Sequence, residues 1–153
     1  MRIVRPLTEG EIALARSVFG ASIDYTRVRI IRGRWWPFQP SGIVMAPTGN
    51  IHFHPADPRW SNDYANESLS LQGLFIHEMT HVWQSQKRGK YYLPLMRHPF
   101  CRYGYQLQQG RRFDLYGLEQ QAEIVRHRFL ADRGVTVPQS CDRGLLPFEG
   151  IVT

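Results

Sequence analysis

The sequence is poor in cysteine: Cys101 and Cys141 are the only two, and they lie far apart in no spacing typical of a metal site. We therefore expect free thiols in a reducing compartment, with one disulfide as the alternative for an exported protein. Long apolar runs are also missing, and no stretch approaches the roughly 18 residues that a transmembrane helix needs. Residues 1–20 carry scattered charges and no apolar block, unlike a signal peptide. These absences predict a cytoplasmic protein without a membrane span.

Linkers, internal repeats and low-complexity segments are absent as well, so we expect one domain over residues 1–153. A content of 42% hydrophobic and 12% aromatic residues is enough to bury a core. The chain is basic, with 19 Lys and Arg against 13 Asp and Glu. The arginines are scattered rather than gathered into a long basic run, which argues against nucleic acid as a partner.

Local signals in the first part of the chain predict one helix and three strands. Thr8 and Glu11 have the spacing of a capping box, and an apolar stripe continues from there to Gly20. Runs rich in β-branched residues predict the strands, which we place after Tyr25 (TRVRIIRG), at residues 42–46 (GIVMA) and at residues 51–55 (IHFHP). The tetrad PTGN between the last two strands is typical of a turn, so they are expected to form a hairpin.

Two long helices complete the expected order, from about Glu67 to Lys87 and from about Tyr116 to Asp132. The sequence therefore predicts an α+β fold. It consists of an N-terminal helix, a small three-stranded sheet with an edge strand at a cleft, and the two long helices.

The first long helix contains the stretch LFIHEMTHVWQ, in which His77, Glu78 and His81 stand out from an apolar background. Residues on a helix advance about 100° each, so the two histidines lie about 40° apart at one edge of the buried face. Such a pair delivers two imidazole nitrogens to one point, as Zn²⁺ needs, and Glu78 lies beside it as a base for a zinc-activated water. The alternative is a pair of core histidines bonded to the backbone, with Glu78 in a salt bridge. Burying three polar groups without a strong partner is unfavourable, which favours the metal site.

A third ligand must come from outside this helix, because catalytic zinc sites usually have three protein ligands and one open position. In the second long helix Glu119 and Glu123 lie side by side at the margin of the core stripe. One can bind the metal while the other accepts the free N–H of a ligand histidine. The alternative is a solvated acidic edge that pairs with Arg126 or His127. Together with the His-Glu-x-x-His motif, the ligand interpretation is the better prediction.

The two helices together resemble those of the gluzincin metallopeptidases, in which two histidines and a glutamate hold zinc and a later acidic residue supports a histidine. The resemblance implies that one Zn²⁺ is held by His77, His81 and Glu119, with Glu123 as the supporting acid. It also implies a minimal zincin-like fold, in which the strand over residues 49–55 borders the cleft and holds an extended peptide by backbone pairing.

More narrowly, the segments GNIHFHP, HEMTHVWQ and YGLEQQAEIV resemble small metallopeptidase domains encoded near Vgr and Rhs elements of type VI secretion loci. The likeness extends from about Leu7 to Leu130. It implies a partner in a secretion apparatus or toxin system, and export by a system that does not use signal peptides.

Hydrolysis of a peptide also needs a donor for the developing oxyanion, and Tyr103 and Tyr105 are our candidates. Both lie in the aromatic segment between the two long helices, where a cleft wall is expected. For each tyrosine alone, packing is the default role. His127, one turn after Glu123, is a further candidate ligand, although a surface histidine is the simpler interpretation.

Two other pairs of residues carry weaker signals. His52 and His54 face the same way on the third strand and could bind a metal or line the cleft, but the polar face of a protected edge strand is the simpler interpretation. Trp35 and Trp36 could form a binding platform, but filling of the core is the default for an aromatic pair.

The sequence therefore predicts a zinc metallopeptidase that hydrolyses amide bonds in peptides, with Glu78 as general base. The main alternative is a zinc-stabilised binding module without catalysis, which a filled fourth metal position would favour. A protease associated with nucleic acid is a third interpretation, suggested by the net charge of +6.

Overall fold

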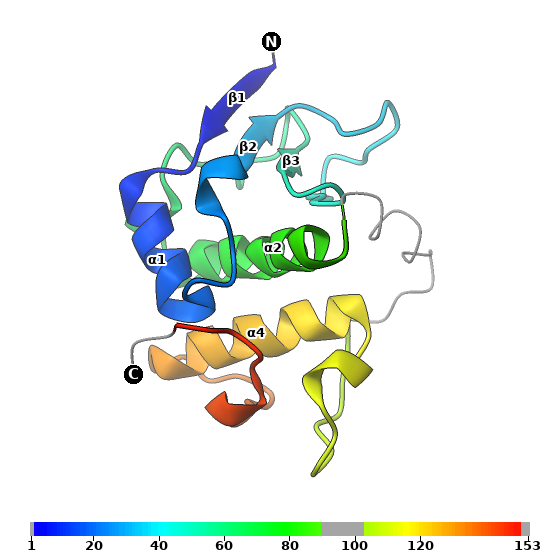
Figure 1. Ribbon diagram of the computed structural model, residues 1–153. Coiled ribbons are helices and arrows are strands. Elements are labelled where there is room, and N and C mark those ends of the chain that lie inside the picture. Colours follow the sequence, from blue (N-terminus) through cyan, green and yellow to red (C-terminus); the bar gives the residue numbers. More distant parts are fainter. Residues whose placement is uncertain (1, 90–102, 151–153) are drawn as a thin grey trace.

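The computed structural model describes residues 2–89 and 103–150, and it confirms the predicted α+β class (Figure 1). The helices and strands of this part of the chain are β1 (Ile3–Pro6), α1 (Glu9–Phe19), β2 (Arg29–Arg32), β3 (Ile51–Phe53), α2 (Leu69–Arg88) and α4 (Leu118–Asp132). Short 3-10 helices lie between them: η1 (Tyr25–Arg27), η2 (Tyr64–Asn66), η3 (Phe113–Leu115) and η4 (Arg143–Leu145).

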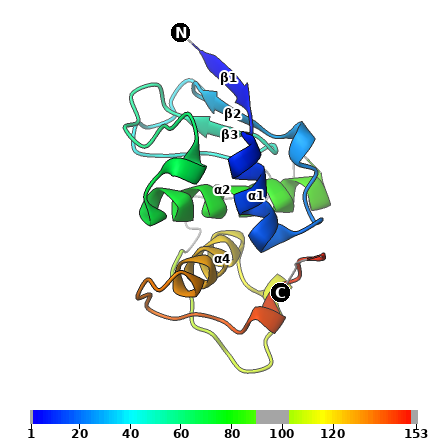
Figure 2. The ribbon, with the colours of Figure 1, turned by 90° about the vertical axis from the view of Figure 1, so that its left-hand side faces the viewer.

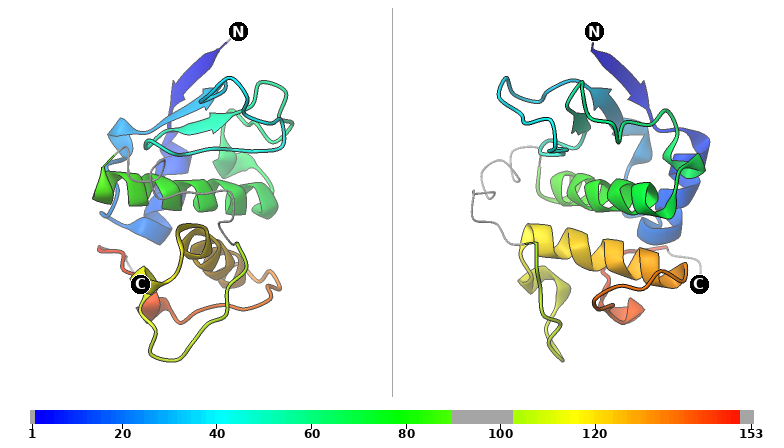
Figure 3. Two further views of the ribbon diagram at one scale, coloured as in Figure 1. Left: turned by 90° about the vertical axis from the view of Figure 1, so that its right-hand side faces the viewer. Right: turned by 180° about the vertical axis from the view of Figure 1, so that it is seen from behind.

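Helix α2 is the centre of the molecule, because the sheet covers one side of it and α4 covers the other (Figures 1 and 3). The middle of α2 is buried without interruption from Phe75 to Ser85. Helix α4 runs antiparallel to α2, and the two approach closely at Gly73, where an added Cβ would meet Leu130 Cδ2 at 3.3 Å. This close packing brings the start of α4 alongside the second half of α2.

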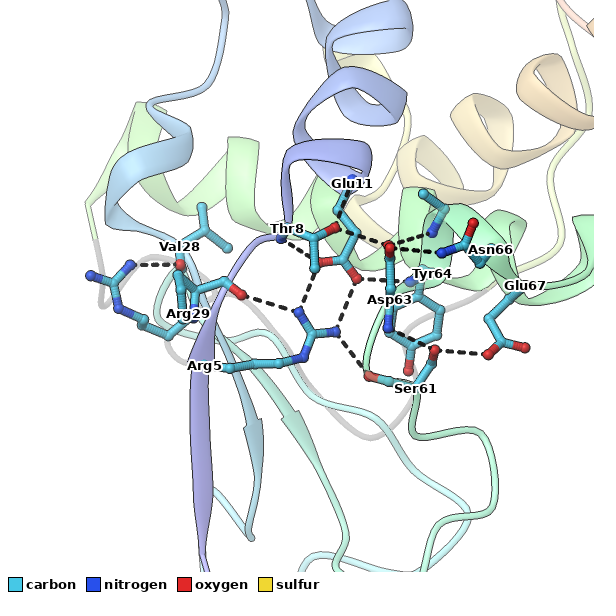
Figure 4. Close-up of polar contacts among 12 residues, drawn as sticks. Arg5, Thr8, Glu11, Val28, Arg29, Ser61, Asp63, Tyr64, Asn66 and Glu67 are labelled. Carbon is cyan, nitrogen blue, oxygen red and sulfur yellow. Dashed lines mark hydrogen bonds and ion pairs between the residues drawn. The ribbon is translucent and has the colours of Figure 1, made fainter.

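The capping box predicted at the start of α1 is present. Thr8 Oγ1 accepts a hydrogen bond from Glu11 N at 3.0 Å, and Glu11 Oε1 accepts one from Thr8 N at 2.9 Å. The Glu11 carboxylate is fully buried and pairs with both terminal nitrogens of Arg5, at 2.8 and 2.9 Å (Figure 4). It also accepts a hydrogen bond from Tyr64 N at 2.9 Å. One buried carboxylate thus joins β1, α1 and η2, which lie side by side in Figure 2.

The sheet differs from the prediction in its first strand. Its order is β1-β2-β3, with β1 antiparallel and β3 parallel to β2. The sequence analysis missed β1, because Ile3 and Val4 are both exposed and the strand therefore lacks the alternation of buried and exposed residues that identifies strands. Pro6 at its end suits an edge strand, since proline has no N–H to donate to a ladder.

The strand predicted at residues 42–46 is wrong: this segment forms only an isolated antiparallel bridge between Met45 and His52. The ladder does not extend because Ile43 bonds within its own loop, its N–H to Pro40 O and its carbonyl to the Gln39 side chain. At the bridge the N–H and the carbonyl of His52 are both bonded to Met45. The edge of β3, expected to be open to a peptide, is therefore covered at its central residue.

The expectation that Trp35 and Trp36 fill the core is also wrong, because 39% and 43% of their surfaces are exposed. Of the two cysteines, Cys141 is a buried thiol, and Cys101 lies outside the described residues. Among the residues that the structure describes, no helix is both long and apolar enough to cross a membrane.

Candidate metal centre

The polar residues of the His-Glu-x-x-His motif lie in the buried stretch of α2. His77, Glu78 and His81 are all less than a tenth exposed, and apolar neighbours on the same helix, such as Ile76 and Met79, are completely buried. Packing of α4 against this stretch adds Glu119, which is equally buried. The helix pair therefore gathers four titratable side chains in the interior.

Two histidine nitrogens converge on the carboxylate of Glu119. His77 Nε2 lies 3.2 Å from Glu119 Oε2, and His81 Nε2 lies 3.0 Å from Glu119 Oε1. Ligand atoms of the three residues all lie within 4.8 Å of one another. Two imidazole nitrogens and a carboxylate oxygen are the donor set of many catalytic zinc sites, so these residues fit a zinc ion.

The structure places Glu123 against the other nitrogen of His77. Glu123 Oε2 lies 3.1 Å from His77 Nδ1, and Arg126 holds the same carboxylate through its Nε at 2.6 Å and its Nη2 at 3.1 Å. With Glu123 against Nδ1, Nε2 is the nitrogen that faces the cluster, and it can bind a metal once its proton is displaced. Arg126, one turn further along α4, keeps Glu123 in this orientation.

His81 has its own partner, Gln84, which the sequence analysis missed. Gln84 Oε1 lies 2.8 Å from His81 Nδ1, while Gln84 Nε2 donates to Leu118 O at 3.0 Å and to Gln121 Oε1 at 2.9 Å. Since the amide nitrogen is used for donation, the oxygen is the acceptor that faces His81, and Nε2 of His81 remains free for the cluster. The signal was available, because Gln84 follows His81 by three positions on a predicted helix.

The cluster favours positive charge at its centre. Burial by itself lowers the pKa of His77, but the hydrogen bonds that its ring donates to Glu119 and Glu123 and the charge of Glu78 outweigh it and raise that pKa to about 10. Burial likewise raises the pKa of Glu119, but its bonds to His77 and His81 hold it well below the usual range. A cation is therefore stabilised where the three side chains meet.

A cavity of about 290 Å³ opens beside the cluster. His77 and Glu78 line it from α2, Glu123 lines it from α4, and Gly42 to Val44 form part of another wall. Tyr103 also lines it and stacks on His77, with ring centroids 6.0 Å apart and planes inclined by 17°.

The other predicted oxyanion donor, Tyr105, lies outside the lining of this cavity. It is buried, and its hydroxyl oxygen lies 2.6 Å from His127 Nδ1 and 3.3 Å from Gln139 O. Burial raises the pKa of Tyr105 and lowers that of His127. The structure therefore brings Tyr103, and not Tyr105, to the cavity, and it pairs His127 with a tyrosine instead of a metal ligand.

Neither His52 nor His54 belongs to the group of metal-ligating side chains found among the described residues. His52 is buried, and burial together with the charge of Arg2 lowers its pKa to about 4, against a weaker opposing effect of a hydrogen bond to the Gly33 backbone. His54 Nε2 lies 3.0 Å from Arg34 Nη2, and its Nδ1 accepts a hydrogen bond from Ala56 N.

Fold and site together define an α+β domain with a buried His–His–Glu centre, carried by two packed helices beside a cavity that two further glutamates line. No protein-family model matches the chain. The chain is 46% identical over 133 residues to the type VI secretion system spike protein VgrG2b of Pseudomonas aeruginosa, a match that covers 82% of this chain and 13% of the spike protein.

The solved effector domain of Pseudomonas aeruginosa VgrG2b is also similar, with a TM-score of 0.73 and 43% sequence identity. This match covers 84% of the present chain and 75% of the solved domain. The chain therefore belongs to the family of the VgrG2b effector domain, and it corresponds to about an eighth of the whole spike protein.

Proposed function

We propose that the protein is a zinc-dependent metallopeptidase of a type VI secretion system, with peptides or proteins as substrates. The observation that supports this most strongly is the convergence of His77, His81 and Glu119, with Glu78 lining the adjoining cavity. The ligands and the base come from elements that pack against each other and are buried, so little reorganisation is needed before a reaction.

In the proposed reaction His77, His81 and Glu119 hold one zinc ion, which when bound supplies the Lewis acidity that activates water and polarises a carbonyl group. Glu78 accepts the proton of the attacking water and delivers it to the leaving amine. Glu123 and Gln84 each fix the ring of one histidine. Tyr103, at the cavity wall, donates to the oxyanion.

The spike protein that contains the related domain is named for its secretion system, which supports the same context for this chain. We propose that the domain is delivered as part of, or together with, the secretion apparatus and therefore needs no signal peptide. A component of that apparatus or an associated toxin would be its partner.

The first test is the metal content of the purified protein beside its His81→Ala and Glu119→Ala variants. About one zinc ion per chain, lost or weakened in both variants, would support the ligand set. The absence of zinc, even after zinc is offered to the chelator-free protein, would contradict it.

The second test is Glu78→Gln, which removes the base and leaves the ligands in place. We expect zinc to be retained and peptide hydrolysis to fall by a factor of about 10² to 10⁴, the usual contribution of general base catalysis. Unchanged turnover would exclude Glu78 as the base. A protein that binds zinc but hydrolyses none of a broad set of peptides would support the non-catalytic zinc module instead.

A further inference from the structure

The loop that follows β2 exposes large aromatic side chains that the candidate metal centre does not use. We call residues 33–44 the aromatic loop; it projects beyond the sheet in Figure 1. Trp35 and Trp36 are 39% and 43% exposed, and Phe38 is 76% exposed. The rings of Trp36 and Phe38 pack edge to face with centroids 5.5 Å apart. These side chains form a protruding apolar tip.

A buried side chain holds this tip in one shape. Gln39 is 2% exposed, and its Oε1 accepts a hydrogen bond from Trp35 N at 2.7 Å. Its Nε2 donates to Ile43 O at 2.9 Å and to His52 O at 3.0 Å, so one amide joins both arms of the aromatic loop to β3. Because the loop is ordered in advance, little conformational entropy is lost when it binds a partner.

Prolines and internal hydrogen bonds reduce the number of backbone N–H groups in the aromatic loop that need water. Pro37 and Pro40 have no N–H. Gln39 N donates to Trp36 O at 3.1 Å, and Ile43 N donates to Pro40 O at 3.2 Å. These internal bonds lower the cost of moving this part of the loop from water to the level of the lipid headgroups.

Arginines surround the base of the aromatic loop. The side chain of Arg2 lies against Gly33, and Arg34 is exposed at the start of the loop. At the other arm Arg59 Nη2 donates to Gly42 O at 2.9 Å. Arg59 is balanced by buried Asp57, with which it pairs, and by the charge of Glu78, whereas Arg2 and Arg34 form no salt bridge among the described residues. The base of the loop therefore has an excess of positive charge, in a chain with a net charge of +6.

We propose that the aromatic loop is an anchor for an anionic membrane surface, with Trp36 and Phe38 at the level of the lipid headgroups and the arginines at the lipid phosphates. Tryptophan and phenylalanine beside arginine are typical of side chains at membrane interfaces. A lipid surface suits a narrow projecting tip better than a protein does, since stable protein interfaces bury about 800 Å² on each partner. Because Gly42 to Val44 also line the cavity, this anchor would hold the candidate metal centre close to the membrane.

The test measures sedimentation of the full chain with vesicles of phosphatidylcholine, with and without one third phosphatidylglycerol. We expect the unmodified protein to bind the anionic vesicles. The double variant Trp36→Ser/Phe38→Ser should bind about tenfold more weakly or worse, since these two side chains provide most of the apolar area that would move from water into the membrane interface. The control Leu115→Ser removes an exposed apolar side chain from η3, at the opposite end of the molecule from the sheet (Figures 1 and 2). It should bind like the unmodified protein.

A second pair of variants distinguishes a specific effect of Arg34 on vesicle binding from the effect of net charge. Arg34→Gln should weaken binding more than Arg112→Gln, because both lower the net charge equally but Arg112 lies in the η3 region and pairs with Asp114. Circular dichroism of every variant shows whether it is folded, and these exposed positions should tolerate substitution.

Three results would overturn the inference: no binding to either kind of vesicle, equal binding by the aromatic double variant, or equal effects of the two arginine variants. The last two would indicate adsorption by net charge alone. If the double variant lost peptide hydrolysis but kept vesicle binding, the aromatic loop would be a wall of the substrate site. Vesicle binding does not require zinc, so its outcome is independent of the proposed peptidase activity.

Discussion

The chain has two closely spaced pairs of histidines, and the structure gives them opposite surroundings. His77 and His81 on α2 meet carboxylates from α4, and the pKa of His77 rises to about 10. His52 on β3 meets no carboxylate among the described residues; burial and Arg2 lower its pKa to about 4, and the neighbouring His54 contacts Arg34.

The comparison shows that spacing alone does not make a metal site. Either pair could direct two imidazoles to one side of its element, one by the helical period and the other by the alternation of a strand. Only the helical pair lies against a second element that contributes acids, so only there do the surrounding charges favour a cation. The predictions that follow test this difference, from the largest expected effect to the smallest.

Removing a proposed ligand should have the largest effect. We expect His77→Asn to weaken zinc binding more than about 100-fold, beyond the range typical for loss of a residue that only supports a ligand. His54→Asn is the matched change in the other pair and should leave zinc affinity unchanged. Competition with a chromophoric chelator measures both affinities. Comparable losses in the two variants would place the metal elsewhere.

Removing the partner of a ligand should have an intermediate effect. Gln84→Leu leaves His81 in place but removes its acceptor, so zinc affinity should fall about 10- to 100-fold. Gln84→Glu keeps the acceptor for His81 but loses the bonds that Nε2 donates to Leu118 O and Gln121 Oε1, so its zinc affinity should lie between those of Gln84→Leu and the unmodified protein. Gln86→Leu, a matched change on the same helix that breaks only bonds to Asp24, is the control. If Gln84 served packing alone, the two Gln84 variants would lose thermal stability without a difference in zinc affinity.

The smallest effect concerns His52 and the stability of the folded protein in acid. Because the pKa of His52 falls from 6.5 to about 4 on folding, the unfolded chain binds more protons between these pH values. The stabilising contribution of neutral His52 is therefore complete above about pH 6.5 and is lost as the pH falls toward 4. His52→Leu should show a shallower loss of unfolding free energy over this window in urea titrations. Parallel pH profiles for the two proteins would contradict the assignment.

Much of the candidate site follows from local sequence. The apolar period and the cap at Thr8 predict α1 and α2 closely, because hydrogen bonds between near neighbours decide where helices begin and end. The relative directions of His77, Glu78 and His81 also follow from helical geometry alone. The confirmed α+β class rests on the same local signals.

Long-range contacts decided which segments form strands and which side chains of the aromatic loop are exposed. Strand β1 exists because its backbone pairs with β2, although its side chains carry no strand pattern. Residues 42–46 have that pattern but lack a ladder, because the Gln39 side chain bonds the Ile43 carbonyl. The exposure of Trp36 likewise depends on how this loop is held.

The sequence by itself determined which side chains α2 presents, because the period of a helix is a property of neighbouring residues. Only the tertiary structure decided that Glu119 meets both histidines, that Glu123 and Gln84 each support one of them, and that His52 stays neutral. These pairings depend on how closely α4 packs against α2 and on which groups are buried together. Their energies arise between residues far apart in the chain.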